Sequence, residues 1–373
     1  MSKNKHVLQI CHGYDGPFLD CARQYAQMFQ HTPYDVTTVF LTGAPAEHVS
    51  TGCCSQQVIF LNKRSKDIRG LKLGTIKQIR QIATTQDFSL CIAHRYKSMY
   101  TACLGSNLPV IAVYHAFGDF QRKTRQLFAK TFHNRLHILA VSNAVRDDIR
   151  CCLPSWPRDK IETLYNRVDV EQLTAGQLER DKARNALQLP GDAWIVGNVG
   201  RLHQDKDQET LLRGFAKALP QLPERSLLVI IGTGKLRQHL GDLAQQLHLE
   251  DKVIFAGHVE NARAYFKAFD LFVLTSDHEP FGMVLLEAMA ARVPIVSTSC
   301  GGAGEVVGDT GILFPLRDSD ALAQHIITIS RLTPEQTRQL QTGMIQRLEN
   351  CFSDAAVTEQ FWQMAMTRTL LDR

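Results

Sequence analysis

The chain has 373 residues, more than one average domain, and its 44% apolar and 21% charged residues are typical of a globular protein. Its length predicts two domains, and the lack of low-complexity tracts and of short repeats argues against a disordered or solenoid protein. The net charge of +5 is uneven, because residues 1–170 contain 22 Lys and Arg against 12 Asp and Glu. The amino-terminal half is therefore the basic half.

The first apolar run ends at His12 and Gly13, which makes it too short for a signal-peptide core or a membrane span. No later segment is long enough to cross a bilayer. The ten cysteines form no C-x-x-C pair and show no zinc-like spacing, so we expect reduced thiols and no metal site. These features predict a cytoplasmic protein.

Short β-branched runs alternate with helical patterns in chain order, which predicts a parallel sheet. Strands are expected at 6–11, 35–41, 57–61, 88–93, 109–114 and 137–141, with helices such as 18–30 and 71–85 between them. The rhythm then restarts, with strands at 193–200, 226–232, 252–257, 270–275 and 294–298. The last segment predicts a terminal helix capped by Ser353 or Asp354.

The predicted fold class is therefore α/β, with two Rossmann-like parallel-sheet domains. We place the first domain at 1–168, the second at 169–352, and the terminal helix at 353–373. Whether that helix returns to the first domain is left open by the sequence.

Ligands of open α/β sheets bind beyond the carboxyl ends of the strands. Polar and glycine residues follow the predicted strands in both halves: Gly16, His94, Arg95, His115, Gly200, Arg201 and Glu279. Packing alone is a poor explanation for this distribution.

The segment "GRLHQDK" places Arg201 and Lys206 between a strand and a helix. A guanidinium, an ammonium and the N–H groups of a helix start together form a clamp for an anion. The alternative is a loop of ordinary surface residues. The "DKD" at 205–207 is better explained as a helix start than as a metal motif, because Asp207 suits a cap and Lys206 would repel a divalent ion.

The segment "SDHEPFGMVLLEAMA" contains Glu279 and Glu287, and apolar residues surround the second. A carboxylate in such a setting needs hydrogen-bond donors. Amides 281–284 form the predicted amino terminus of a helix, so a polyhydroxylated, phosphorylated ligand would satisfy both carboxylates and the helix end. The alternative for Glu287 is a salt bridge to an arginine such as Arg292.

A basic strip lies in the first half and is opposed only by Asp67: Lys63, Arg64, Lys66, Arg69, Lys72, Lys77 and Arg80. Such a strip suits an anionic membrane surface. It contains no aromatic residue for base stacking, so we do not expect nucleic acid as a partner. The alternative is an ordinary solvated face.

Five segments resemble, in their order and spacing, a retaining glycosyltransferase of the GT-B fold, family four: "AVSNAV", "IETLYNRVD", "GRLHQDK", "SDHEPFGMVLLEAMA" and "VPIVSTSCGGAGEVV". The E-x7-E match is the most specific, and "EPFGMVLLEA" is similar to bacterial lipopolysaccharide-core glycosyltransferases. The resemblance covers nearly the whole carboxyl-terminal half and, more loosely, the first half. It implies two Rossmann-like domains facing one another across a cleft.

The resemblance implies roles residue by residue. Arg201 and Lys206 would hold the donor diphosphate, Glu279 would lie near the transferred sugar, and Glu287 would bind ribose. His115 would lie near the reacting centre, although a histidine that ends a strand is often a core residue. Further donor contacts are expected from Gly16, Gly200, Val259, Phe281, Gly282, Met283 and Val284, and acceptor-side contacts from His94 and Arg95.

Two departures from the family pattern stand out. The usual Lys-Gly is Lys206-Asp207 here, which puts the adjoining turn in question, and the usual Asn-Gly is Asn166-Arg167, which touches only the hinge.

The resemblance implies a hexosyl transfer without a cofactor or divalent metal, from a UDP-sugar to a saccharide or lipid-linked acceptor at the inner face of the cytoplasmic membrane. Cations that stabilise the departing phosphate would supply the electrostatic catalysis. Three rivals share parts of this pattern. They are a GT-B epimerase or phosphorylase, a protein that only binds nucleotide sugars, and a membrane-surface scaffold.

Overall fold

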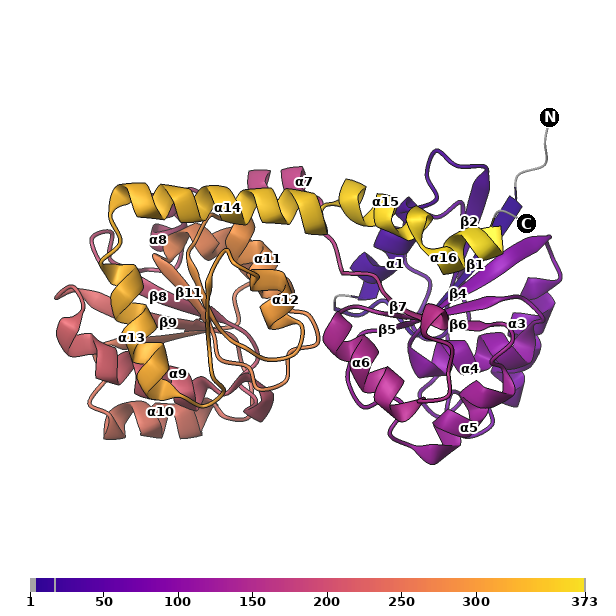
Figure 1. Cartoon of the computed structure of the whole chain (residues 1–373), viewed down its shortest axis with the longest axis horizontal. Coiled ribbons are helices and arrows are strands. Elements are labelled where there is room, and N and C mark those ends of the chain that lie inside the picture. Colours follow the sequence, from indigo (N-terminus) through magenta and orange to yellow (C-terminus); the bar gives the residue numbers. More distant parts are fainter. Residues whose placement is uncertain (1–4, 17, 372–373) are drawn as a thin grey trace. The chain divides into compact units, whose positions relative to one another are not determined.

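The computed structural model describes residues 5–16 and 18–371, and these form two compact units (Figure 1). Unit 1 contains residues 5–16, 18–165 and 357–371, and unit 2 is Asn166–Ala356. The sequence placed the domain boundaries after residues 168 and 352, whereas the units divide after Tyr165 and Ala356. Each unit is built on one parallel sheet, so the predicted α/β class with two Rossmann-like domains is confirmed.

Unit 1 has a sheet of seven parallel strands within the described residues, in the order β3-β2-β1-β4-β5-β6-β7. The order reverses between β1 and β4, which pair directly. A reversal of this kind opens a crevice at the carboxyl ends of the strands. The strands are β1 (Lys5–Cys11), β2 (Tyr34–Phe40), β3 (Gln57–Phe60), β4 (Phe88–His94), β5 (Val110–Tyr114), β6 (Leu136–Ala140) and β7 (Ile161–Thr163).

Most helices of unit 1 connect these strands, and the last two, α15 and α16, come from the carboxyl-terminal segment of the chain. They are α1 (Phe18–Gln27), α2 (Glu47–Gly52), α3 (Leu73–Ala83), α4 (Arg95–Gly105), α5 (Lys123–Thr131), α6 (Asn143–Cys152), α15 (Asp354–Gln363) and α16 (Ala365–Leu371), with a 3-10 turn η1 (Arg158–Lys160). The division between the units falls within the first turn of α15.

Unit 2 repeats the plan with six parallel strands in the part of the chain that is described, in the order β10-β9-β8-β11-β12-β13. Here the order reverses between β8 and β11, which also pair directly. The strands are β8 (Trp194–Val199), β9 (Ser226–Ile231), β10 (Val253–Gly257), β11 (Leu271–Leu274), β12 (Ile295–Thr298) and β13 (Ile312–Phe314).

The helices of unit 2 lie on both faces of its sheet (Figure 1). They are α7 (Val170–Ala175), α8 (Arg180–Ala186), α9 (Gln208–Ala218), α10 (Arg237–Gln246), α11 (Met283–Ala290), α12 (Ala303–Val307), α13 (Ser319–Ser330) and α14 (Pro334–Phe352), with 3-10 turns η2 (Gln204–Lys206), η3 (Leu219–Gln221) and η4 (Ala262–Ala268).

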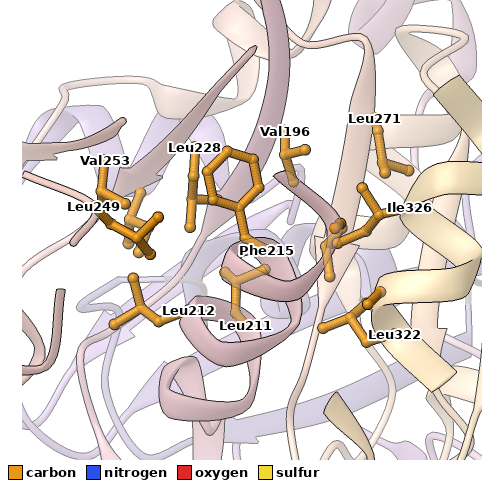
Figure 2. Close-up of a cluster of buried hydrophobic side chains, with 14 of the residues drawn as sticks. Val196, Leu211, Leu212, Phe215, Leu228, Leu249, Val253, Leu271, Leu322 and Ile326 are labelled. Atoms are coloured by element: carbon orange, nitrogen blue, oxygen red, sulfur yellow. The ribbon is translucent and has the colours of Figure 1, made fainter. Parts of the chain in front are cut away.

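Helix coverage on both faces explains why the strands read as continuous apolar runs rather than alternating ones. Figure 2 shows one such face in unit 2, where Phe215 of α9 lies among side chains of the strands and of α13. Leu322 and Ile326 of α13 are fully buried in the same cluster. This core fixes the sheet whose edge carries the candidate site.

The terminal segment packs on unit 1. Phe361 and Trp362 form edge contacts with Phe29 of the loop after α1, and the Tyr34 hydroxyl donates to the carbonyl of Leu371 at 2.6 Å. The expectation of one terminal helix was wrong, because α15 and α16 are separate helices that break at Met364. The Ser353 hydroxyl accepts from the amide of Ala356, so Ser353 is the cap.

Candidate functional site

The candidate site of unit 2 lies where β8 and β11 end, at the reversal of strand order. Gly200 follows β8, Gly232 follows β9 and Gly257 ends β10, so three neighbouring strands reach glycine at the same edge. A Cβ on Gly232 would lie 1.9 Å from the carbonyl oxygen of Gly200, and Gly232 has a φ of +142°. Only glycine allows this close contact between the two backbones. A Cβ on Gly200 would meet only side-chain carbons of Lys206, at 4.0 Å, so a ligand can approach the backbone at Gly200.

Lys206 and Glu279 meet in this site although they are far apart in the sequence. The Lys206 Nζ lies 2.6 Å from the Glu279 Oε2, and their side chains are 18% and 10% exposed. The Ser276 hydroxyl donates to the same carboxylate oxygen at 3.2 Å. Lys206, predicted to hold the donor diphosphate, is therefore paired with Glu279, the carboxylate expected near the transferred sugar.

Arg201 lies in the same loop but is far more exposed, at 72% of its side chain. Its guanidinium contacts the Asp205 carboxylate at 3.2 Å, and that carboxylate also accepts from His203 at 2.6 Å. The carbonyl of Asp205 accepts from the amide of Asp277 at 3.0 Å, which ties this loop to the segment that carries Glu279. Arg201 can therefore reach an incoming anion by rotating its side chain.

Asp207 stands where the family pattern has glycine, and the structure shows how the turn accommodates it. Its φ is +44°, the left-handed region that favours glycine, so the backbone turn is kept at some cost in strain. Its side chain caps α9 as predicted, accepting from the amide of Thr210 at 3.4 Å and from its hydroxyl at 2.7 Å. These bonds offset the strain, since Asp is tolerated there when its side chain bonds locally.

The amino terminus of α11 faces the site through a constrained turn. Gly282 has a φ of +101°, and a Cβ there would lie 2.8 Å from Leu285. Gly302 approaches the carbonyl of Pro280 so closely that its own Cβ would lie 2.4 Å away, and its amide donates to the carbonyl of Glu279 at 2.8 Å. The helix begins at Met283, so the positions predicted to bind the donor, from Phe281 through Val284, all lie in its first turn or just before it.

Glu287 is partly buried on α11, and burial raises the pKa of its carboxyl group to about 7, while the nearby Arg263 opposes this shift. Among the described residues Glu287 makes no ion pair, so the alternative of a salt bridge to an arginine such as Arg292 was wrong. The cation whose charge acts on its carboxyl group, Arg263, lies in η4. Its carboxylate can thus accept hydrogen bonds from an added ligand. Val259 lies in the loop between β10 and η4 and is half-buried.

Unit 1 brings three histidines to the reversal point of its own sheet. His12 follows β1, His94 ends β4 and His115 follows β5, and these strands are neighbours. His94 Nδ1 and His115 Nε2 lie 3.3 Å apart, with the rings stacked at 18°. Burial lowers the pKa of His115 to about 4, with a further contribution from Arg95, and lowers the pKa of His94 well below its usual range. Both rings are therefore neutral at pH 7.

The two histidines share one proton, and the structure favours one placement of it. His94 is 5% exposed, and its Nε2 has no partner among the described residues. A buried unpaired N–H is rarer than a buried unpaired acceptor, so Nε2 is the bare nitrogen and Nδ1 donates. His115 then accepts at Nε2 and carries its own proton at Nδ1. It is thus prepared to donate a hydrogen bond rather than to take up a proton.

The remaining residues predicted in unit 1 surround this cluster. Arg95 begins α4 with a φ of +69°, and its guanidinium lies 4.4 Å from the Phe18 ring centroid. Gly16, in the turn after β1, has a φ of +60°, and a Cβ there would meet nothing within 4 Å. The need for glycine at position 16 is therefore explained by the backbone conformation and not by a close contact within the chain.

The basic strip is a surface feature of unit 1. Five of its cations are exposed, whereas Lys63 and Lys72 are half-buried. The Lys72 Nζ lies 4.2 Å from the Tyr100 ring centroid, which holds this part of the strip against α4. Leu71 and Leu73 are 68% and 70% exposed on either side of it, so apolar side chains stand among the cations.

Sequence reasoning missed His12, Ser276 and Arg263. His12 could have been found from the strand order, because the residue after β1 always lies at the reversal point of such a sheet. Ser276 and Arg263 carry no local signal. No helix of the described chain is long and apolar enough to cross a membrane, and the described residues contain no group of three or more His, Cys, Asp and Glu side chains placed to hold a metal ion.

Solved structures define the fold. A glycosyltransferase of Rickettsia africae superposes with a TM-score of 0.83 and 17% identity, covering 99% of both chains. HepE of Anabaena in complex with UDP-glucose superposes with a TM-score of 0.75 and 21% identity, covering 98% of this chain and 100% of that one. The fold is thus GT-B, the class of two Rossmann-like units.

Two family models then place the chain. "Glycosyl transferases group 1" matches residues 179–344, and "Glycosyltransferase Family 4" matches residues 21–172. A lipopolysaccharide core biosynthesis glycosyltransferase of Rhizobium meliloti is 32% identical over 187 residues, 50% of this chain and 53% of that protein. The chain spans about half the length of the curated relatives it matches. It belongs to the family-four glycosyltransferases.

Proposed function

We propose that this chain transfers a hexosyl group from a UDP-sugar to a saccharide acceptor, with retention of anomeric configuration and without a divalent metal. One observation carries the proposal. The Lys206–Glu279 pair lies at the strand reversal of unit 2, beside the first turn of α11 and the bare backbone of Gly200. A cation, a carboxylate, a helix amino terminus and a glycine edge together suit a sugar diphosphate.

The chemistry follows from the charges that develop during transfer. As the sugar leaves, negative charge grows on the β-phosphate, and Lys206 and Arg201 are the cations that stabilise it. The diphosphate replaces Glu279 as the partner of Lys206. The freed carboxylate of Glu279 then accepts a hydroxyl of the sugar, while Glu287 accepts hydroxyls of the ribose.

The proton of the acceptor hydroxyl goes to the departing phosphate, which lies on the same face of the sugar as the incoming oxygen. This step retains the configuration and needs no second catalytic carboxylate. His115, neutral and protonated at Nδ1, contributes a hydrogen bond to the reacting sugar. The proposal therefore gives His115 an orienting role and leaves base catalysis to the substrate.

The choice of donor and acceptor is supported by similarity. HepE, whose fold this chain shares, is described in complex with UDP-glucose, and the Rhizobium meliloti relative acts in lipopolysaccharide core biosynthesis. We extend this to a lipid-linked acceptor at the cytoplasmic face of the membrane. The exposed cations of the basic strip and the two exposed leucines among them suit an anionic lipid surface.

The test starts with a thermal-shift panel of UDP, GDP and ADP sugars, in which a bound donor raises the apparent melting temperature by mass action. The donor that binds is then incubated with candidate saccharide acceptors in the presence and absence of a chelator. Proton NMR of the product reads the anomeric configuration. Conversion of the donor without any acceptor would favour an epimerase, and inversion of the configuration would overturn the mechanism.

A further inference from the structure

The main-chain carbonyl of Ser276 accepts hydrogen bonds from two side chains. The hydroxyl of Thr298 donates to it at 2.6 Å, and the thiol of Cys300 donates to it at 2.9 Å. Ser276 and Thr298 are fully buried, and Cys300 is 6% exposed. A carbonyl oxygen has two lone pairs, so these two donors satisfy it completely. The end of β12 therefore holds the backbone of the segment that follows β11.

Ser276 lies where the chain leaves the sheet of unit 2. The ladder between β11 and β12 ends at Leu274, so the carbonyl of Ser276 lies beyond the last backbone pair. On its other side β12 pairs with β13 as far as Thr298. Thr298 and Cys300 are thus carried by a strand that is fixed on both sides. Their side-chain donors take the place of the ladder bonds that a buried carbonyl would otherwise need.

Ser276 connects this support with Glu279. Its hydroxyl donates at 3.2 Å to Oε2 of Glu279, the oxygen that Lys206 contacts at 2.6 Å. In the proposed reaction the diphosphate replaces Glu279 as the partner of Lys206. Within the described part of the chain, Ser276 then remains as the side-chain donor that orients this carboxylate. The amide of Gly302 also donates to the main-chain carbonyl of Glu279, at 2.8 Å. Both the carboxylate and the backbone of Glu279 therefore depend on residues 298–302.

The thiol of Cys300 is in the protonation state that a donor needs. Burial raises its pKa, the Thr298 hydroxyl opposes this shift, and the charge of the nearby Glu279 adds to it. The thiol therefore keeps its proton at pH 7. Thr298 and Cys300 each have one proton to donate, and both donate it to the Ser276 carbonyl. A buried, protonated thiol is a poor nucleophile, so its contribution here is the hydrogen bond.

We propose that Thr298 and Cys300 are positioning residues of the transfer reaction. They act through Ser276, whose place they fix, and so hold the Glu279 carboxylate at the transferred sugar. The inference rests on the proposed transferase function and deepens it. A misplacement of about 1 Å can lower a rate by about 10², so a contact to the reacting sugar needs a rigid support of this kind. Recognition of the sugar should therefore depend on the two donors, whereas recognition of UDP should not.

The test compares the affinity of the full chain for UDP-glucose with its affinity for UDP, by isothermal titration calorimetry. Thr298→Val with Cys300→Ala removes both donors and keeps the two side chains small and apolar. This variant without donors should show an affinity for UDP-glucose, relative to UDP, that is lower by about tenfold, because a hydrogen bond to a charged group is weakened. Its kcat should fall by about 10², with an unchanged Kd for UDP.

Two further variants separate a loss of donors from a loss of packing. Thr298→Ser with Cys300→Ser keeps both donors and should retain most of the preference for UDP-glucose. The matched control is Thr310→Val with Cys351→Ala in the same unit, where the Thr310 hydroxyl donates to the carbonyl of Val307 at 2.8 Å. It also removes one hydroxyl and one thiol, and it should leave both the affinity ratio and kcat unchanged.

Two outcomes would overturn the proposal. One is an affinity ratio and a kcat in the variant without donors that equal those of the wild type. The other is an equal loss in the serine variant or in the control, which would mean that packing and not hydrogen bonding was disturbed. If circular dichroism shows that the variant without donors is unfolded, Thr298→Val alone is used, since it removes the shorter of the two bonds.

Amide hydrogen exchange adds a readout that needs no donor sugar. In the variant without donors the amide of Gly302 should exchange about tenfold faster, while the amide of Val273 inside β11 stays protected. Faster exchange at Gly302 in a chain that transfers no sugar would retain the link to Glu279 and reject the transferase. Transfer by the wild type, with exchange and affinity ratio unchanged in the variant, would retain the transferase and reject the positioning role.

Discussion

The ion pair between Lys206 and Glu279 provides the sharpest test of the site. Replacing Lys206 with Met keeps the length of the side chain and removes its charge. The Glu279 carboxylate, with 10% of its side chain exposed, would keep the Ser276 hydroxyl as its one side-chain donor within the described part of the chain. The double variant, Lys206→Met with Glu279→Gln, also removes the negative charge that would be left unpaired on Glu279. The two variants therefore separate the role of the pair in folding from its role in catalysis.

The magnitude follows from the contact. Removing one partner of a buried pair costs about 3–5 kcal/mol, and the remaining exposure of these side chains reduces this to about 2–3 kcal/mol. For a unit of this size that corresponds to a fall in melting temperature of about 4–12 °C. Loss of the cation that stabilises the leaving phosphate should lower kcat/KM by about 10²–10³. The double variant should regain most of the stability and none of the activity.

The assay combines urea unfolding with steady-state transfer from the donor identified above. The matched control is Lys217→Met, because Lys217 also pairs with a carboxylate, Asp320, at 2.8 Å, but both side chains are exposed. That variant should lose less than about 1 kcal/mol and keep its activity. A Lys206→Met variant as stable and as active as the wild type would refute the reasoning. Recovery of activity in the double variant would show that the cation has no part in the reaction.

Three further predictions concern Glu287, the histidine pair and the basic strip. The pKa of Glu287 is raised from 4.5 to about 7 on folding, so between these pH values the unfolded chain releases a proton that the folded chain keeps, and rising pH favours unfolding. Glu287→Gln should therefore be more stable than the wild type by about 1–2 kcal/mol at pH 8, with no difference below pH 4.5 in urea unfolding curves. His94→Phe should abolish the preference of His115 for a proton at Nδ1, read from imidazole ¹⁵N shifts, and unchanged shifts would refute the shared proton. In the wild type, kcat/KM should show no inflection from His115 between pH 5.5 and 7, because its pKa is about 4. Reversing the charge of three exposed strip cations, Arg64, Lys66 and Lys77, should weaken binding to phosphatidylglycerol vesicles by about 10² or more without affecting donor hydrolysis. Equal vesicle binding would show that the strip is an ordinary solvated face.

Local patterns were enough to predict most of the fold. Continuous apolar runs identified eleven of the strands in the described chain, because strands buried on both faces have few polar residues. The strands β7 and β13 were missed because each has only three residues, too few for a pattern. The break at Met364 was missed for a different reason. Its surroundings are good helix formers, and the packing of the terminal segment on unit 1 is a tertiary effect.

The candidate site was predictable where a residue follows a strand. The meeting of Lys206 with Glu279 follows from the neighbouring positions of β8 and β11, which the strand order fixes. The cation whose charge acts on Glu287 could not be predicted from the sequence. Arg292 is close in the chain, but Arg263 reaches α11 from a 3-10 helix that no short-range pattern relates to it.

The division of the chain has a practical consequence. Unit 2 is an insertion, since residues 357–371 complete the core of unit 1 after the chain has formed the whole of unit 2. An isolated amino-terminal fragment would leave Phe29 and Tyr34 uncovered and should aggregate. Chimaeras that exchange sugar specificity therefore need two junctions, after Tyr165 and after Ala356, with both flanks taken from the same parent.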